Sequence, residues 1–308
     1  MPQELQEWLP RSGILSYEEI LRIVRVSSGL GVRKVRVTGG EPLVRRDVIP
    51  FLEQLCALDG IEDVGISTNG TLLNTPYPDS EGETIAQRVV ATGVRTCNVS
   101  LDSLDRETYA HNTGRDYLPR VLDGIDAALA AGFESVKLNA VLMKNQNEHE
   151  LSRLVDFAHQ KGLLLRFIEL MPVSTREMLN EDNFLATGAA RRLLEDNFGP
   201  LEPDTGFRTN GPASYYNVPG REQRIGFIGA MTNLHFCESC DKLRLTCDGK
   251  LRPCLGSFLE FDLFELLRKE PTDEEIGAFF RDVVDRKPKE HDFRNNYEPN
   301  RRMVAIGG

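Results

Sequence analysis

The chain has 308 residues, enough for one large or two medium domains, and its hydrophobic fraction of 40% is ample for a core. Its net charge of −10 argues against a general nucleic-acid binder and against a binder of anionic membranes. Most of its six cysteines lie late in the chain, which is not typical of a secreted disulfide framework. With no charged-then-apolar leader and no run of 18 apolar residues, we expect a soluble, cytoplasmic protein.

A repeated junction organises the first half of the chain. A glycine followed by an apolar residue precedes each strand-like run, at Gly31, Gly60, Gly93, Gly132 and Gly162. Glycine fits the left-handed conformation that follows a helix end. Capping-box patterns predict two helix starts, at Ser16 with Glu19 and at Thr84 with Gln87. The predicted strands are residues 33–38, 63–68, 96–101, 136–142 and 164–170.

This alternation of strands and helices predicts an α/β fold with a parallel sheet. Five strand–helix units in tandem favour an incomplete β/α (TIM-like) barrel over a doubly wound sheet. No Gly-x-Gly-x-x-Gly motif follows the first strand, which argues against a dinucleotide-binding domain.

The predicted strands carry polar side chains at alternating positions, and period two places these on one face: Lys34, Arg36, Thr38, Asn98, Ser100, Asp102, Lys137, Asn139 and Arg166. A barrel strand covered outside by helices points its polar face into the lumen. Buried cations cost several kcal/mol each unless they are paired, so we expect a polyphosphate or carboxylate ligand there. The alternative is internal ion pairing with Glu41, Asp102 or Glu169.

Polar residues also gather at the predicted C-terminal ends of the strands, where β/α barrels form their sites. They are residues 38–42, which read Thr-Gly-Gly-Glu-Pro, with 67–70, 100–102 and 169–172. The paired glycines Gly39 and Gly40 allow the backbone to approach a ligand closely, although the same motif is also ordinary turn chemistry. Met171 alone is more often core packing than a ligand contact.

The repeat stops after Pro172, which predicts a second domain. In chain order we expect a polar connector at 174–184, a helix at 189–198, a loop at 200–212, a hairpin of 215–218 with 224–228, and helices at 262–269 and 273–285. The predicted domains are therefore residues 1–172, the partial barrel, and residues 173–308.

A cysteine run follows the predicted hairpin. Cys237 and Cys240 form a Cys-x-x-Cys pair, and Cys254 comes later with basic residues around it. Such a pair can place two thiolates on one ion, and three thiolates leave one iron of an iron–sulfur cluster open. Zinc, with His235 as an awkwardly placed fourth ligand, and unligated thiols are the alternatives.

Taken together, these motifs resemble the GTP 3′,8-cyclase family of radical S-adenosylmethionine enzymes, lyases that begin molybdenum cofactor synthesis. The resemblance rests on residues 38–42, 98–102 and 166–169, on the three cysteines and on the terminal Gly307-Gly308, and it covers essentially the whole chain. It implies an incomplete β/α barrel holding an N-terminal 4Fe-4S cluster and S-adenosylmethionine, with a second, C-terminal 4Fe-4S cluster that binds GTP through its open iron.

The resemblance also implies the chemistry and the residue roles. A 5′-deoxyadenosyl radical abstracts the ribose 3′ hydrogen of GTP, giving (8S)-3′,8-cyclo-7,8-dihydroguanosine 5′-triphosphate. By the resemblance, residues 173–308 correspond to the iron–sulfur and GTP-binding domain.

The implied metal ligands are Cys237, Cys240 and Cys254, and the implied S-adenosylmethionine contacts are Gly40, Ser100 and Met171. The implied GTP contacts are Arg36, Ser67, Lys137, Lys242, Leu243 and Arg244, with Arg166 and Lys34 joining the charged lumen. No catalytic side chain is assigned; GTP and S-adenosylmethionine are the expected partners, alongside a homodimer, with no nucleic acid or membrane.

The sequence departs from the family pattern in two places. Lys242 and Asp241 match an Arg and an Asn, and Lys lacks the planar fork of Arg. The Cys-x3-Cys-x2-Cys run of the N-terminal cluster is absent, and residues 1–10 resemble the stretch that follows it. We therefore expect a chain that is N-terminally truncated, lacks the first strand and, as given, does not cleave S-adenosylmethionine. The alternatives are a natural chain acting as a non-catalytic GTP- or cluster-binding module, and a zinc-stabilised structural protein.

Overall fold

A computed structural model gives the fold of the chain and describes residues 9–78, 80–173, 179–180, 182–295, 297, 299–301 and 303–306. The predicted opening at Met1–Trp8, most of the connector at 174–184, and Gly307-Gly308 lie outside the described residues. No helix in the described ranges is long and apolar enough to cross a membrane.

An eight-stranded sheet forms the centre of the fold, in the order β1-β2-β3-β4-β5-β8-β7-β6. Its strands are β1 (Lys34–Val37), β2 (Asp63–Thr68), β3 (Thr96–Ser100), β4 (Ser135–Leu142), β5 (Leu164–Glu169), β6 (Glu202–Pro203), β7 (Ser214–Asn217) and β8 (Arg224–Ile228). Strands β1 to β5 and β8 run parallel, while β7 pairs antiparallel with β8 and with β6. The predicted parallel sheet and the hairpin are confirmed.

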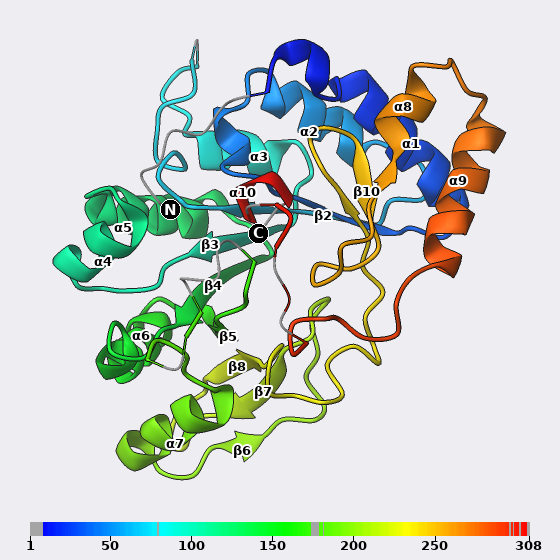
Figure 1. Ribbon diagram of the computed structural model, residues 1–308. Coiled ribbons are helices and arrows are strands. Elements are labelled where there is room, and N and C mark those ends of the chain that lie inside the picture. Colours follow the sequence, from blue (N-terminus) through cyan, green and yellow to red (C-terminus); the bar gives the residue numbers. More distant parts are fainter. Residues whose placement is uncertain are drawn as a thin grey trace.

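Helices follow the strands along the outer side of this curved sheet (Figure 1). They are α1 (Tyr17–Gly29), α2 (Val48–Cys56), α3 (Ile85–Ala91), α4 (Arg106–Thr113), α5 (Leu118–Ala131), α6 (Leu151–Gln160) and α7 (Thr187–Phe198), with short 3-10 turns η1 (Arg11–Gly13), η2 (Pro42–Val44) and η3 (Glu148–Glu150). Both predicted capping boxes are present, at Ser16 and at Thr84. The five junction glycines all have positive φ, as expected after a helix end.

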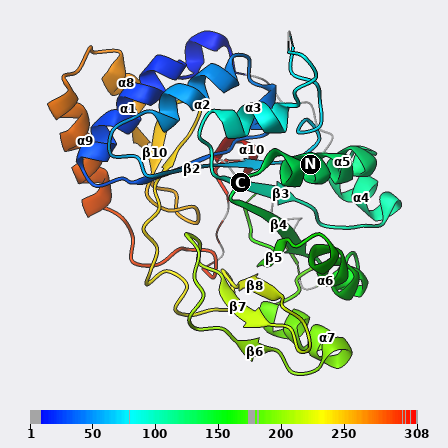
Figure 2. The same cartoon turned by 180° about the vertical axis from the view of Figure 1, so that it is seen from behind.

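The C-terminal elements are a small sheet of β9 (Arg244–Leu245), β10 (Lys250–Arg252) and β11 (Phe261–Asp262), then α8 (Leu263–Leu267), α9 (Asp273–Asp285) and α10 (Met303–Ile306). Most of these elements lie beside α1, and in both views β10, α8 and α9 are well separated from the group of α4, α5, α6 and α7 (Figures 1 and 2). The predicted helices at 262–269 and 273–285 thus correspond to α8 and α9.

Two hydrophobic cores hold these parts together. The large one lies between the sheet and its outer helices and includes Ile66, Leu138 and Phe167. The second joins Ile23 of α1 to Leu251 of β10 and to the inner faces of α8 and α9. The first helix, α1, therefore also packs against the C-terminal elements. Because β8 pairs with β5, the sheet continues into the part of the chain after residue 172. The division of the chain at that residue stays a prediction.

The loop after β2 is set by a close contact between two glycines. A Cβ at Gly124 in α5 would lie 2.0 Å from the carbonyl oxygen of Gly70, which has a φ of 79°. Only a residue without a side chain lets α5 pack this closely on the segment that follows the strand. This contact positions the C-terminal end of β2, where polar residues gather.

We predict that Gly124→Ala lowers the free energy of unfolding by about 1–3 kcal/mol, because the methyl group has no room. The matched control is Gly188→Ala in α7, where a Cβ meets nothing within 4 Å. It is expected to change stability by less than about 1 kcal/mol. Urea unfolding of both variants measures this, and equal stabilities would contradict the packing argument.

Candidate functional site

Strand register places the predicted lumen residues side by side on one face of the sheet. Three rows cross it: Arg36 beside Gly65 and Thr96, Ser67 beside Asn98 and Lys137, and Asn139 beside Arg166 and Gly226. The intervening residues point into the large core. The period-two prediction for this face is confirmed.

Arg36 lies flat across the neighbouring strands rather than pointing along its own. Its Nη1 donates to Thr96 Oγ1 at 2.8 Å and lies 3.4 Å from the carbonyl oxygen of Ile66. A Cβ at Gly65 would sit 1.9 Å from this nitrogen, so the glycine makes the space for the guanidinium. Burial lowers the pKa of Arg36, an effect that Asp63 partly offsets.

Lys137 and Arg166 are the most deeply buried cations of this face, each with only 7% of its surface exposed. Burial, with the positive charges of Arg166 and Arg36, lowers the pKa of Lys137 to about 8. Burial likewise lowers the pKa of Arg166, whose Nε donates to Asn139 Oδ1 at 2.9 Å.

Within the described residues, neither cation has a carboxylate oxygen within 4.0 Å, and the Lys137 ammonium makes no hydrogen bond. Asp63 only partly offsets the lowering of the Lys137 pKa, and buried charge without a close partner is costly, so an anion would be stabilised on this face.

The three carboxylates that could have paired with these cations are engaged elsewhere. Glu41 accepts from Asn69 N at 2.7 Å and from Thr68 Oγ1 at 2.8 Å, and burial raises its pKa. Asp102 accepts from Val141 N at 2.8 Å, and burial raises its pKa to about 6. These contacts fasten the segments that follow β1 and β3 to the ends of the neighbouring strands β2 and β4.

Glu169 is fully buried and also accepts from backbone and hydroxyl donors. Its two oxygens take the N–H groups of Thr187 at 2.8 Å, Met231 at 2.8 Å and Thr232 at 3.0 Å, with both threonine hydroxyls. The carboxylate thereby ties the end of β5 to the start of α7 and to the segment after β8. The alternative of internal ion pairing in the lumen is not supported at any of the three carboxylates.

Asn210 joins Lys34, predicted to belong to the charged lumen, to the predicted GTP contact Lys242, although the two lie far apart in the sequence. Its Oδ1 accepts from Lys34 Nζ at 2.6 Å, its Nδ2 donates to Asp63 Oδ2 at 2.6 Å, and its carbonyl accepts from Lys242 Nζ at 3.2 Å. Sequence reasoning missed this residue, because it lies in a stretch predicted only as loop and no spacing pattern marks it. The cysteine-bearing segment and the first two strands thus meet at one loop.

The three residues predicted to contact S-adenosylmethionine lie at C-terminal strand ends of one sheet. Gly40 follows β1, Ser100 ends β3, and Met171 follows β5. Gly40 and Ser100 are exposed, Met171 is half-buried, and a Cβ at Gly40 would meet nothing within 4 Å. This edge is open, and the assignment of the three residues stays a prediction.

The cysteine segment forms a turn beside a cavity of about 440 Å³ that Cys237, Cys240 and Lys287 help to line. Cys240 N donates to the carbonyl oxygen of Cys237 at 3.0 Å. Burial raises the pKa of Cys254; the sulfurs of Cys237 and Cys240 raise it further, whereas Lys287 lowers it. The three thiols therefore belong to one neighbourhood, although no group of three or more His, Cys, Asp or Glu side chains in the described chain is arranged as a metal site.

The other residues predicted near the cysteines each have contacts of their own. Arg244 is close enough to Cys240 and Cys254 for both sulfurs to raise its pKa against the lowering effect of burial. Leu243 packs against the second core. His235, the fourth ligand of the zinc alternative, instead pairs with Glu238 through Nδ1 at 2.6 Å. Cys247 is exposed, and its carbonyl accepts from Leu15 N at 2.8 Å.

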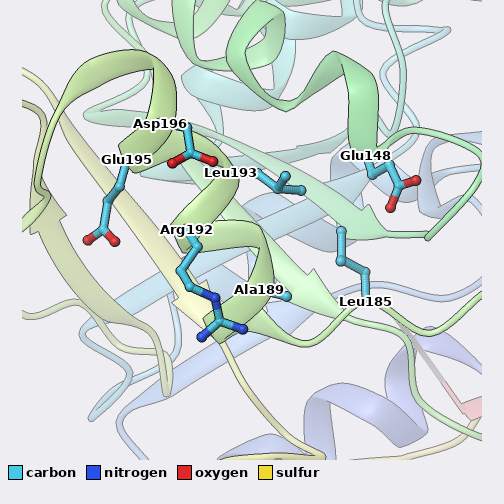
Figure 3. Close-up of a pocket in the computed structure, with 7 residues that line it drawn as sticks. All are labelled: Glu148, Leu185, Ala189, Arg192, Leu193, Glu195 and Asp196. Carbon is cyan, nitrogen blue, oxygen red and sulfur yellow. The ribbon is translucent and has the colours of Figure 1, made fainter.

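A separate cavity of about 510 Å³ lies where α7 meets the segment before α6 (Figure 3). Its charged lining residues are Glu148, Arg192, Glu195 and Asp196, and its apolar lining residues are Leu185, Ala189 and Leu193. None of the predicted site residues lines it. Its mixed charges show no preference for an anion, in contrast to the lumen.

Comparison with known proteins accounts for this arrangement. Residues 5–158 match the Radical SAM superfamily, and residues 163–293 match the Molybdenum Cofactor Synthesis C family. The GTP 3′,8-cyclase of Rhodopirellula baltica is 40% identical over 316 residues, covering 100% of this chain and 84% of that protein. The GTP 3′,8-cyclase of Thermodesulfovibrio yellowstonii is 38% identical, covering 100% of this chain and 92% of that protein.

The chain belongs to the GTP 3′,8-cyclase family. The resemblance inferred from the motifs is confirmed. The fold agrees, because Streptococcus suis SuiB superposes with a TM-score of 0.56 over 82% of this chain and 57% of that one, at 16% identity. The predicted partial β/α barrel is therefore the fold of the radical S-adenosylmethionine superfamily.

Membership of this superfamily implies a 4Fe-4S cluster and S-adenosylmethionine. The donor chemistry of the C-terminal site fits a cluster, because three thiols share one neighbourhood with the cations Lys287 and Arg244 beside them. The residues present do not fit the N-terminal cluster, since the printed sequence has no Cys-x3-Cys-x2-Cys run. Cys97 is fully buried, and burial raises its pKa to about 12.

Proposed function

We propose that the chain performs the GTP-binding part of the GTP 3′,8-cyclase reaction of molybdenum cofactor synthesis. The triphosphate would lie against the cationic face of the sheet, and the guanine would reach toward the C-terminal cysteines. The observation that carries this proposal is the pair Lys137 and Arg166, which are buried without a carboxylate partner among the described residues. A polyphosphate supplies several negative charges at once and matches such a face.

Each predicted residue has a stated task in this proposal. Arg36, Lys137, Arg166 and Lys34 hold the phosphates, and Ser67 supports the same face from β2. Lys242, Leu243 and Arg244 contact the substrate from the cysteine segment. Lys242 is exposed and bonded to Asn210, so its single ammonium can reach the mouth of the lumen even though it lacks the planar fork of Arg.

Two further binding tasks complete the proposal. Gly40, Ser100 and Met171 form the edge that would hold S-adenosylmethionine, with Gly40 allowing close approach to the backbone. Cys237, Cys240 and Cys254 would hold a 4Fe-4S cluster whose remaining iron is open to the substrate. A cluster of this superfamily supplies one-electron chemistry, and the chain's own residues bind, orient and shield the nucleotide. A cytoplasmic location and a homodimer stay predictions.

We predict that Lys137→Ala weakens GTP binding by about ten- to a hundredfold, because a charge-assisted hydrogen bond contributes about 1.5–3 kcal/mol. The pH dependence follows from the pKa of about 8 in the free chain. A bound phosphate raises that pKa, so GTP binding takes up a proton above pH 8. The affinity of the unmutated chain should therefore fall as pH rises above 8, by up to about tenfold per pH unit.

The matched control is Lys137→Arg, which keeps its charge throughout this range. Its affinity should lack this fall, and any ionisation of the ligand itself is common to both proteins. Calorimetric titration with GTP between pH 7 and pH 9.5 makes the comparison. Identical pH profiles, or unchanged affinity in Lys137→Ala, would contradict the placement of the triphosphate on this face.

The cysteines generate a separate prediction. After anaerobic reconstitution, the unmutated chain should hold about four irons with matching sulfide. Cys240→Ser should hold little, because the cluster needs that thiolate. Cys247→Ser should behave like the unmutated chain, because Cys247 is not one of the predicted ligands. Iron and sulfide counting decides this. A cluster lost in Cys247→Ser and kept in Cys254→Ser would overturn the ligand assignment, and zinc without sulfide would favour a structural metal.

A further inference from the structure

Lys287 directs its ammonium between the two cysteine-bearing segments. Its Nζ donates to the carbonyl oxygen of Lys242 at 2.7 Å and to that of Pro253 at 2.5 Å, and it lies 3.7 Å from Cys240 Sγ. A lysine ammonium has three donors and no acceptor. These three contacts therefore use its entire hydrogen-bonding capacity.

The two carbonyls belong to opposite sides of the proposed cluster site. Lys242 comes two residues after Cys240, and Pro253 comes directly before Cys254. Lys287 also lines the same cavity as Cys237 and Cys240. One side chain thus links the backbone next to one proposed ligand to the backbone next to another.

The position of Lys287 is set from outside the cysteine segments. Its backbone N–H donates to the carbonyl oxygen of Val284 at 3.0 Å, at the end of α9. Helix α9 buries Ile276, Phe280 and Val283 in the second core. Its first residue, Asp273, accepts from Arg22 Nε of α1 at 2.8 Å. The ammonium is therefore presented by a packed helix rather than by a free loop.

We propose that Lys287 is a positioning residue of the C-terminal cluster. It holds the segments of Cys240 and Cys254 at a fixed separation and keeps a positive charge against the sulfur of Cys240. The proposal rests on the cluster site proposed above. Partners that orient metal ligands change metal affinity about 10- to 100-fold when they are removed. A nearby positive charge also favours the reduced cluster, because that form carries one more electron.

The test compares Lys287→Met with Lys289→Met in the full chain. Lys289 lines the same cavity but is exposed and makes no hydrogen bond or ion pair among the described residues. After anaerobic reconstitution, we expect iron loss to a chelator to be about tenfold faster in Lys287→Met, with a more negative reduction potential. Lys289→Met should lose iron within about twofold of the unmutated rate, since it removes equal charge without breaking the link.

Two further variants keep the comparison decisive. Lys287→Gln, beside Lys289→Gln, repeats the test with a polar side chain should methionine prevent folding. Lys287→Arg restores charge and donors, so its potential should return toward the unmutated value. The positioning role alone is overturned if Lys287→Met and Lys287→Gln lose iron no faster than the unmutated chain, or if the matching Lys289 variants lose it equally fast. A chain that takes up no cluster overturns this role together with the cluster site.

Discussion

The structure depends on a group of cations that the fold largely removes from water without a salt bridge among the described residues. Lys137, Arg166 and Arg36 lie on one face of the sheet, and burial lowers the pKa of each. Neighbouring positive charges lower the pKa values of Lys137 and Arg166 further, whereas Asp63 partly offsets the effect of burial at Arg36. The nearby carboxylates Glu41 and Glu169 accept hydrogen bonds from backbone and hydroxyl groups instead. Burying these charges is unfavourable in the free protein, and in the proposed function an anionic substrate relieves that cost on binding.

The packing of the rest of the fold holds this face in place. The outward residues of the same strands form a dense core under the outer helices, so the sheet is held from one side. Small residues then make room for the cations: Gly65 lies under the guanidinium of Arg36, and Gly226 lies against the stem of Arg166. The C-terminal elements are attached through the contact of Lys242 with Asn210 and through the second core on α1. The cationic face and the cysteine segment are thereby joined in one packed unit.

The sequence predicted the parts that depend on local chemistry. Glycine junctions and capping boxes located the strand–helix units, because left-handed ends and capped starts involve neighbouring residues. Period two placed Arg36, Lys137 and Arg166 on one face, because side-chain direction alternates within a strand. The three cysteines were visible from their spacing.

Contacts between distant segments could not be predicted in this way. Lys287 lies 47 positions from Cys240, and Asn210 lies 176 positions from Lys34. Neither pair has a period or a spacing that would reveal it. The amphipathic pattern of α9 predicts a buried face, but it does not say that α1 covers it. The parallel pairing of β5 with β8 across residue 172 likewise depends on packing rather than on local sequence.

The central claim is that the cationic face binds the phosphates of the nucleotide. The most direct measurement is the affinity of the chain for guanosine, GMP, GDP and GTP by calorimetry at low and high salt. The account predicts that affinity rises with each added phosphate, and that the gain shrinks as salt screens the charges. If guanosine bound as tightly as GTP, or if the gain were independent of salt, the uncompensated cations would have another purpose and the account would be wrong.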